Sequence, residues 1–215
     1  MARMGRRPGP SSTRDEIVAA AAARFAAAGY DATSMRQVAA AAGVDPALVR
    51  RFFGDKEGLF TAVAAALIDP EAAAAAVAAG PPGQAGERVL RYFLGLLGDI
   101  QRPGPLLGLV RSAVTSEHAA ILMRRFLAGR VLGPVAAALS PERPDLRGAL
   151  VASQLVGIAV TRYAVRLDPL TAATTDDLVS WVAPVLQHYL TASQIPAGHP
   201  GPSRPARDTT RRTGD

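Results

Sequence analysis

Residues 13–60 read TRDEIVAAAAARFAAAGYDATSMRQVAAAAGVDPALVRRFFGDKEGLF, and this stretch decides the fold. Apolar side chains recur at helical spacing along its first part and fall on one stripe: Ile17, Ala21, Phe25 and Ala28. Thr13 and Glu16 have the spacing of a capping box, and Gly29 is the residue type that tolerates a left-handed C′ position. We therefore expect a first helix that opens at Thr13 and ends at Gly29.

A second, short helix follows the first. Ser34 and Gln37 repeat the capping spacing immediately before residues 35–42, and Gly43 closes that segment. The expected second helix is therefore only about two turns long, and it ends in a tight turn.

A third short helix follows that turn. Asp45 is a suitable N-cap with Pro46 at the first helical position, and the helix is expected to run to about Phe53. Gly54 and Asp55 then stop this helix and cap a fourth one that begins at the next residue. Two brief helices joined by a few residues form a helix-turn-helix, whose second helix enters the major groove of DNA.

Helical geometry divides the third helix into two faces. Val49 and Phe53 are four residues apart and are expected to point into the core, towards Val38 and Phe25. On the opposite face, Arg50 is the long polar side chain best placed to reach a base edge. A guanidinium suits the O6/N7 pair of guanine, and contact with phosphate alone is the open alternative.

Lysine occurs once among the 24 Lys and Arg residues, at Lys56. It begins the expected fourth helix, in the phrase FGDKEGLF of residues 53–60. The first N–H groups of a helix carry partial positive charge and favour an anion. A compact ammonium at that end is therefore placed to meet a DNA phosphate.

Residues 13–60 resemble the N-terminal DNA-binding domain of the TetR family of transcriptional regulators. The positions that agree are Phe25, Gly29, Tyr30, Thr33, Ser34, Val38, Ala39, Ala42, Gly43, Val44, Phe53, Lys56 and Glu57. The resemblance implies an all-α fold, with an N-terminal three-helix helix-turn-helix DNA-binding domain and a C-terminal helical ligand-binding and dimerisation domain. It also implies a ligand-responsive repressor that binds a palindromic operator as a dimer and is released by a small, largely hydrophobic effector.

The resemblance implies which side chains meet DNA. They are Thr33, Ser34, Arg36, Pro46, Ala47, Leu48, Arg50, Phe52 and Lys56. Thr33 and Ser34 would cap the second helix and touch phosphate, and Arg36 would approach bases or backbone. Lys56 would neutralise a phosphate.

The sequence departs from the common family pattern at two of these positions. The family often has tyrosine where Arg50 stands, so operator preference cannot be copied from relatives. Many members have a polar residue such as histidine where Phe52 stands. The Phe52 ring either packs onto a thymine methyl or folds back to the core.

The composition fits a DNA-binding protein and argues against a cofactor. The 215 residues are 49% hydrophobic, carry a net charge of +6 and include no cysteine, which excludes disulfides and thiolate metal sites. His118, His188 and His199 lie far apart without metal-ligand spacing, so no metal or other cofactor is expected. The basic character makes an acidic partner such as nucleic acid plausible.

No enzyme motif is present in the sequence: there is no GxSxG, phosphate-cradling glycine loop or histidine pair. The alternative within DNA-binding proteins is a nonspecific architectural binder, whose affinity falls with salt alike on any sequence. No secretory signal is recognised, and the alanine-rich stretch 62–79 is interrupted by Asp69 and Pro70 and is expected to be too weakly apolar for a membrane span. A cytoplasmic protein without a membrane partner is the expectation.

Four regions are expected along the chain: a basic flexible arm at 1–10, the DNA-binding domain at 11–60, the effector-binding and dimerisation domain at 61–195, and a disordered basic tail at 196–215. Within the third region, helical runs are expected at about 84–99, 104–115, 117–139, 147–166 and 175–192. Pro184 predicts a kink or a later start for the last of these.

The resemblance implies a homodimer through the last two long helices. The matching candidates are Leu150, Gln154, Gly157, Ile158 and Thr161 with Leu178, Val182, Val185 and Tyr189. Any one of them could equally be part of the chain's own core. A dimer is also favoured because one short recognition helix reads too few base pairs, whereas a two-fold dimer reads two half-sites.

The resemblance also places an effector pocket among the middle helices. The apolar candidates are Tyr92, Phe93, Leu96, Leu107, Val110, Met123, Phe126 and Trp181, and the possible polar anchors are Arg111, Thr115, His118 and Gln154. The apolar residues could also be plain core. As a group they favour a hydrophobic or aromatic ligand held by few polar contacts.

Overall fold

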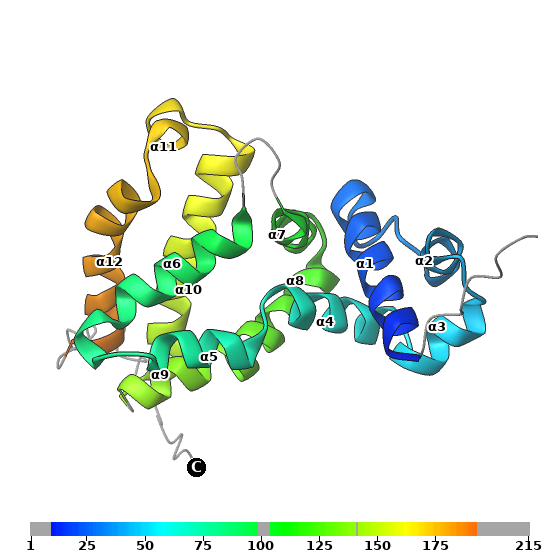
Figure 1. The fold of residues 1–215 in the computed structure, drawn as a ribbon, viewed down its shortest axis with the longest axis horizontal. Helices are drawn as coiled ribbons and strands as arrows, with labels where there is room; N and C mark the ends of the chain where they lie inside the picture. Colours follow the sequence, from blue (N-terminus) through cyan, green and yellow to red (C-terminus); the bar gives the residue numbers. More distant parts are fainter. Residues whose placement is uncertain (1–9, 99–103, 141, 193–215) are drawn as a thin grey trace, which may run out of the picture.

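The computed structural model describes residues 10–98, 104–140 and 142–192, and the described chain is built of helices without strands (Figure 1). The first helices are α1 (Pro10–Ala28), α2 (Met35–Ala42), α3 (Pro46–Phe53), α4 (Lys56–Leu67), α5 (Pro70–Ala78), α6 (Ala85–Leu97) and α7 (Pro105–Thr115). The remaining ones are α8 (Glu117–Phe126), α9 (Leu132–Leu139), α10 (Pro144–Ala159), α11 (Asp168–Ala172) and α12 (Thr175–Thr191). The all-α expectation is confirmed.

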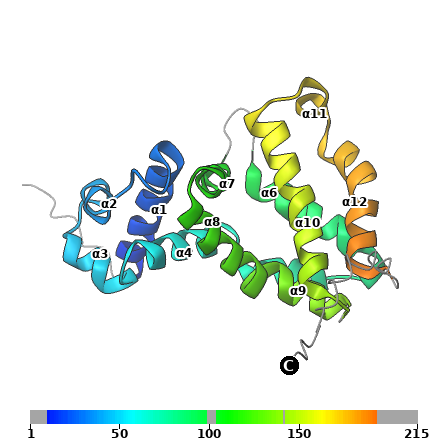
Figure 2. The same ribbon diagram turned by 180° about the vertical axis from the view of Figure 1, so that it is seen from behind.

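The molecule is elongated, with α1–α3 at one end and α10–α12 at the other (Figure 1 and Figure 2). Helices α4, α7 and α8 lie between these ends in both views. The arm at 1–10, except for its last residue, and the tail at 196–215 lie outside the described residues.

The helix-turn-helix forms as its capping residues predict. Ser34 and Gln37 make the expected capping box at the start of α2, and Gly43 closes the helix in the left-handed conformation with φ 66°. The Asp45 carboxylate accepts a hydrogen bond from the Ala47 N–H at 2.7 Å and so caps α3.

The first helix differs from its expected start. It begins at Pro10, so Thr13 lies inside the helix and the expected capping box of Thr13 and Glu16 is wrong. Proline suits the first helical position because its ring fixes φ and its missing N–H would have no partner there.

Two hydrophobic cores are buried. The first holds Ile17, Phe25, Val38, Val49, Phe53 and Phe60 from α1–α4, together with Leu109, Leu122, Met123 and Phe126 from α7 and α8. The second joins α5 and α6 to α10 and α12 and includes Val89, Leu94, Leu155, Leu186 and Leu190. Helices α7 and α8 therefore complete the core on which the DNA-binding helices rest.

Helix α7 crosses α1 at a very short distance. A Cβ atom added to Gly108 would lie 2.5 Å from both Cα and Cβ of Ala26. Arg111 Nη2 donates to the Ala26 carbonyl at 2.5 Å, and Ser112 Oγ donates to the Phe25 carbonyl at 3.4 Å. The glycine permits the close approach. Arg111 supplies a donor to the Ala26 carbonyl near the end of α1, whereas the Phe25 carbonyl also accepts from the Gly29 N–H at 2.9 Å.

The helices of the second half correspond to the expected runs, with local changes. The run at 117–139 is divided between α8 and α9 by a π-helical turn at Leu127–Val131, and α10 continues into another at Val160–Ala164. Helix α12 begins at Thr175 and contains Pro184 within it, so the alternative of a later start is wrong. Helices α5 and α11 were not expected.

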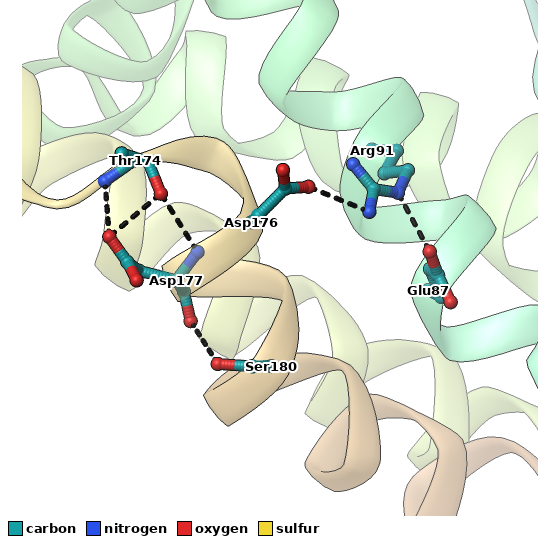
Figure 3. Close-up of polar contacts among 6 residues, drawn as sticks. All are labelled: Glu87, Arg91, Thr174, Asp176, Asp177 and Ser180. Carbon is teal, nitrogen blue, oxygen red and sulfur yellow. Dashed lines mark hydrogen bonds and ion pairs between the residues drawn. The ribbon is translucent and has the colours of Figure 1, made fainter.

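The start of α12 is held by a capping box and by α6 (Figure 3). The Thr174 hydroxyl donates to the Asp177 carboxylate at 2.7 Å, and the Thr174 N–H donates to it at 2.8 Å. Both hydrogen bonds favour the ionised carboxylate and lower the pKa of Asp177. Arg91 on α6 bridges Glu87 at 2.8 Å and Asp176 at 2.9 Å, in exposed pairs that stabilise little individually.

The stretch Lys56–Ala78 contains a window of 18 residues whose mean hydropathy is 1.5, so it is long and apolar enough for a membrane span by composition. By composition alone, the expectation that the alanine-rich stretch is too weakly apolar for a membrane span is therefore wrong. In the structure the stretch is two helices, because Asp69 ends the first and caps the second by accepting from the Glu71 and Ala72 N–H groups. Helix α4 packs on α1 and α8, and α5 packs on α6, as the core helices of a globular protein do.

Candidate DNA-binding surface and effector cavity

Helix α3 presents two different faces. Val49 is 0% exposed and Phe53 is 9% exposed, so both point into the first core as expected. Pro46, Ala47 and Arg50 are exposed on the other side. Helix α3 therefore has an apolar face that packs against the domain and an exposed face that carries the guanidinium of Arg50.

Several of the expected DNA contacts surround one shallow hollow between α2 and α3. Its lining consists of Met35, Arg36, Pro46, Ala47 and Arg50. Arg36 from α2 and Arg50 from α3 contribute the positive charge, and the other three side chains are apolar. Such a surface can hold a phosphate or a base edge by its guanidinium groups and contact a thymine methyl by its apolar floor.

Three expected contacts are less accessible than the sequence suggested. Thr33 is 2% exposed, and its hydroxyl donates to the Gly29 carbonyl at 2.8 Å. It therefore stabilises the α1–α2 turn, and only Ser34 caps α2. Phe52 and Leu48 are half-buried, and Phe52 packs against the first core.

Lys56 begins α4, as expected, and it lies against the α1–α2 turn. Its Nζ donates to the Asp31 carbonyl at 3.3 Å and sits 4.2 Å from the centroid of the Tyr30 ring. Partial burial lowers the pKa of Lys56, and the charge of Asp31 opposes that effect. Burial raises the pKa of Tyr30 to about 12, assisted by Glu57, Asp55 and Asp31.

His118 lies far from the expected pocket position, at the junction of α8 with the DNA-binding helices. Its Nε2 contacts Glu57 Oε1 at 2.6 Å, and its ring stacks on Tyr30 at a centroid distance of 5.7 Å. Two residues earlier, Ser116 Oγ donates to Asp31 Oδ1 at 3.0 Å. We call these five residues the α8 clasp, because the start of α8 holds both the α1–α2 turn and the start of α4.

A cavity of about 180 Å³ lies among the middle helices. The expected residues that line it are Tyr92, Phe93, Leu96, Val110 and Met123. Sequence reasoning missed Ile68, Ala73, Val77, Val89, Leu106, Ala113, Val114, Leu127, Val131, Leu132, Val135, Ala152, Leu155 and Val156. These come mainly from α5, α7, α9 and α10 and from the π-helical turn, and only their apolar character marks them in the sequence.

The other expected pocket residues do not line this cavity. Phe126 is buried in the first core, Arg111 bonds to α1, and Thr115 donates to the Arg111 carbonyl at 3.0 Å. Leu107 packs against the second core, and Gln154 is half-buried on α10. Trp181 is 82% exposed on α12, and its side chain is therefore outside any enclosed site.

Tyr92 is the one residue of the cavity lining with a hydroxyl group. The hydroxyl donates to the Asp69 carbonyl at 3.2 Å, at the junction of α4 and α5. Burial raises the pKa of Tyr92, and the charge of Asp69 adds to the effect. This hydrogen bond links the cavity wall to the connection that follows α4, whereas Lys56 lies at the other end of that helix.

Helix α12 presents apolar side chains to the outside. Trp181 and Val185 are four residues apart, and Val185 is 39% exposed. Of the expected interface residues, Ile158 and Leu178 are buried in the chain's own core, whereas Leu150, Gln154, Gly157, Thr161, Val182, Val185 and Tyr189 keep exposed surface. No cluster of three His, Asp or Glu side chains that could hold a metal occurs within the described ranges.

An exposed recognition helix, a helical body with an apolar cavity and a clasp between them define the class of helix-turn-helix DNA-binding regulators. The family model for bacterial regulatory proteins of the tetR family matches residues 17–63. The model for the tetracyclin repressor-like C-terminal domain matches residues 83–190. No curated protein sequence matches the chain.

Solved structures agree with the family models. A TetR-family regulator from Streptomyces coelicolor A3 is 39% identical, with a TM-score of 0.63, over 86% of this chain and 98% of that one. Salmonella enterica GusR and the fatty acid degradation regulator FadR from Bacillus halodurans share the fold at 15% and 16% identity. Each has a TM-score of 0.60, and the matches cover 86% and 85% of this chain and 99% and 97% of theirs. The chain belongs to the TetR family.

Membership of the TetR family indicates the general function of the chain. TetR-family regulators are soluble, non-enzymatic DNA-binding transcriptional regulators that bind operators and act as dimers. The chain is therefore a transcriptional regulator of this kind.

Proposed function

We propose that this protein is a ligand-responsive repressor in the cytoplasm, which binds a palindromic operator as a dimer and leaves it when a small, largely hydrophobic effector occupies the 180 Å³ cavity. The observation that carries the proposal is the combination of an exposed Arg36–Arg50 hollow with an apolar cavity among the middle helices of the same chain. The proposed domains are residues 11–60 for DNA binding and 61–195 for effector binding and dimerisation.

The DNA contacts are proposed at the accessible residues of α2, α3 and α4. Arg36 and Arg50 share one hollow, so both can reach the same stretch of the major groove. Ser34 and Lys56 lie at the starts of α2 and α4, where helix N–H groups favour a phosphate. The buried Thr33 contributes by fixing the turn that presents Ser34.

The dimer is proposed to form through α10 and α12. An exposed tryptophan beside an exposed valine is an unusual feature of a monomer's surface, and aromatic side chains are enriched in the centres of interfaces. Trp181 is therefore assigned to the dimer interface and not to the effector pocket. Replacing Trp181 with glutamate is expected to convert the dimer to a monomer in sedimentation analysis, with the helical circular dichroism signal retained.

Operator release is proposed to be a population shift. The effector binds better to a dimer whose recognition helices are wrongly spaced. Operator affinity then falls, at most by the ratio of the effector's affinities for the two states. A ligand that binds the cavity tightly and leaves operator affinity unchanged would contradict this mechanism.

The proposed function is tested by selecting the purified protein on randomised duplex DNA and titrating the enriched sequence against scrambled competitor. A specific regulator enriches an inverted repeat bound by two or four protomers and prefers it by roughly 10³-fold or more. If no sequence is enriched and binding tracks ionic strength alone, the protein is a nonspecific DNA binder.

A further inference from the structure

The cavity offers a ligand almost no polar partner. Of its nineteen lining residues, eighteen have apolar side chains, and no charged side chain from the described residues reaches the lining. An ionised carboxylate or ammonium placed there would lose its hydration shell without gaining a counter-ion, at a cost of several kcal/mol. The lining therefore selects against charged ligands.

The exception among the lining residues is Tyr92, which carries a hydroxyl group, and the hydrogen of that hydroxyl is already committed. It donates to the Asp69 carbonyl at 3.2 Å, so the oxygen retains only its capacity to accept a hydrogen bond. A phenol of ordinary pKa is already protonated and neutral at physiological pH, and burial raises the pKa of Tyr92 further. A ligand group that donates one hydrogen bond can use this oxygen, whereas a carbonyl or carboxylate oxygen cannot.

The volume limits the size of the occupant. An apolar protein cavity of about 150 Å³ is large enough to hold benzene. The cavity described here measures about 180 Å³, which is suited to a single ring with one or two small substituents. Its wall includes Val114, which is 73% exposed and marks the side open to solvent.

We propose that the effector is an uncharged, single-ring-sized apolar compound whose only polar group, where it has one, is a hydrogen-bond donor directed at Tyr92 Oη. This inference rests on the proposed role of the cavity as the effector site and adds the chemical class of its ligand. The proposed class includes neutral aromatic or cyclic compounds and simple phenols, and it excludes carboxylates, acyl phosphates and quaternary amines.

Binding of four compounds of matched size to the full-length protein, by titration calorimetry at pH 7, tests the class. They are toluene, p-cresol, benzoate and benzylamine, the last two being ionised at that pH. Toluene and p-cresol are expected to bind at least about 100-fold more tightly than the two ions, because only the ions must be desolvated without a partner. Tighter binding of benzoate or benzylamine would overturn the class while leaving the cavity as the effector site.

Substitutions in the cavity wall test where the ligand binds and which atom it contacts. Tyr92→Phe is expected to weaken p-cresol roughly fivefold, the value of one neutral hydrogen bond, and to leave toluene within about twofold. Ala152→Leu fills the cavity and is expected to abolish binding of both, and Ala113→Leu serves if that variant does not fold. Equal weakening of toluene and p-cresol by Tyr92→Phe would exclude the donor assignment.

The failures of the two proposals can be told apart. Toluene binding that survives both cavity-filling variants would move the ligand elsewhere and refute the cavity as its site. Absence of binding by all four compounds up to their solubility would overturn the ligand class. Neither result would change the outcome of the operator selection, which tests the DNA-binding function separately.

Discussion

The crossing of α1 and α7 depends on a missing side chain, and replacing Gly108 with alanine tests that dependence. The new Cβ would lie 2.5 Å from the backbone and side chain of Ala26, whereas carbon atoms pack at roughly 3.5–4 Å. The two helices would have to separate by roughly 1 Å. Overpacking of this kind costs about 1–3 kcal/mol, and alanine in place of glycine in a helix returns about 0.5–1 kcal/mol.

The net loss in the free energy of unfolding is therefore about 0–2.5 kcal/mol, which lowers the melting temperature by up to about 10 °C for a chain of this length. Thermal and urea unfolding at one fixed protein concentration measure the change, since dimerisation makes stability depend on concentration. The crossing also brings Arg111 and Ser112 to the last carbonyls of α1, so separation would lengthen those bonds too.

Gly95 provides a matched control for Gly108. It is also inside a helix, α6, but it is exposed and no atom lies within 4 Å of an added Cβ. Gly95→Ala is expected to raise stability by about 0.5–1 kcal/mol, because only the helix-propensity term remains. If Gly108→Ala proves as stable as Gly95→Ala, the close crossing does not constrain the fold and the reasoning fails.

Three further perturbations address the DNA surface, the clasp and the α12 cap. Arg50→Ala is expected to weaken operator binding about 5- to 150-fold and to relax discrimination at one base pair, whereas uniform weakening across operator variants would assign it to phosphate. A double-mutant cycle of His118→Ala and Glu57→Ala is expected to give a coupling free energy of about 0.2–1 kcal/mol, because both side chains are half exposed. If the two substitutions change the free energy of unfolding additively, the two side chains do not interact. Asp177 has a lowered pKa in the folded state, so its capping contribution is present above its unfolded pKa and is lost as the pH falls through the folded pKa. Asp177→Asn is thus expected to lower the melting temperature at neutral pH, with the difference disappearing in acid, and a pH-independent difference would contradict the capping role.

The sequence predicted the helix-turn-helix well because its signals are local. The caps at Ser34, Asp45 and Asp55 act on N–H groups two or three residues away, so the pattern alone determines where α2, α3 and α4 begin. Thr33 was misjudged for a related reason. Its hydroxyl turns inward to a carbonyl of the preceding turn, and that choice depends on how the turn folds over α1.

The apolar cavity could be predicted only in part, because its wall is assembled from distant segments. The family resemblance pointed to the lining residues on α6 and α7, whereas Ile68 and Ala152 come close to them only through the packing of α4–α5 and α10. His118 was assigned to the cavity because of its place in the middle of the chain. Its actual partner, Tyr30, is 88 positions earlier in the sequence, and no periodicity indicates such a pair.

The candidate DNA-binding surface and the apolar cavity make contacts near opposite ends of α4. At its start, Glu57 contacts His118 of the α8 clasp and Lys56 lies over Tyr30, beside the DNA surface. Just beyond its end, the Asp69 carbonyl accepts the hydrogen bond of Tyr92 from the cavity wall. A twelve-residue helix spans roughly 18 Å and does not bend readily between its ends.

Helix α4 is continuous from Lys56 to Leu67, and only Ile68 separates it from Asp69, so we expect a displacement at the Tyr92 contact to pass through this short connection to the start of α4. The α8 clasp limits the directions in which the start of α4 can move, since it ties the same turn that presents Ser34. A ligand that separates Tyr92 from Asp69 would therefore alter the position of α4 against the clasp. That coupling gives the proposed effector a physical means of changing operator affinity without touching α3, as a population shift between two positions of one rigid element requires.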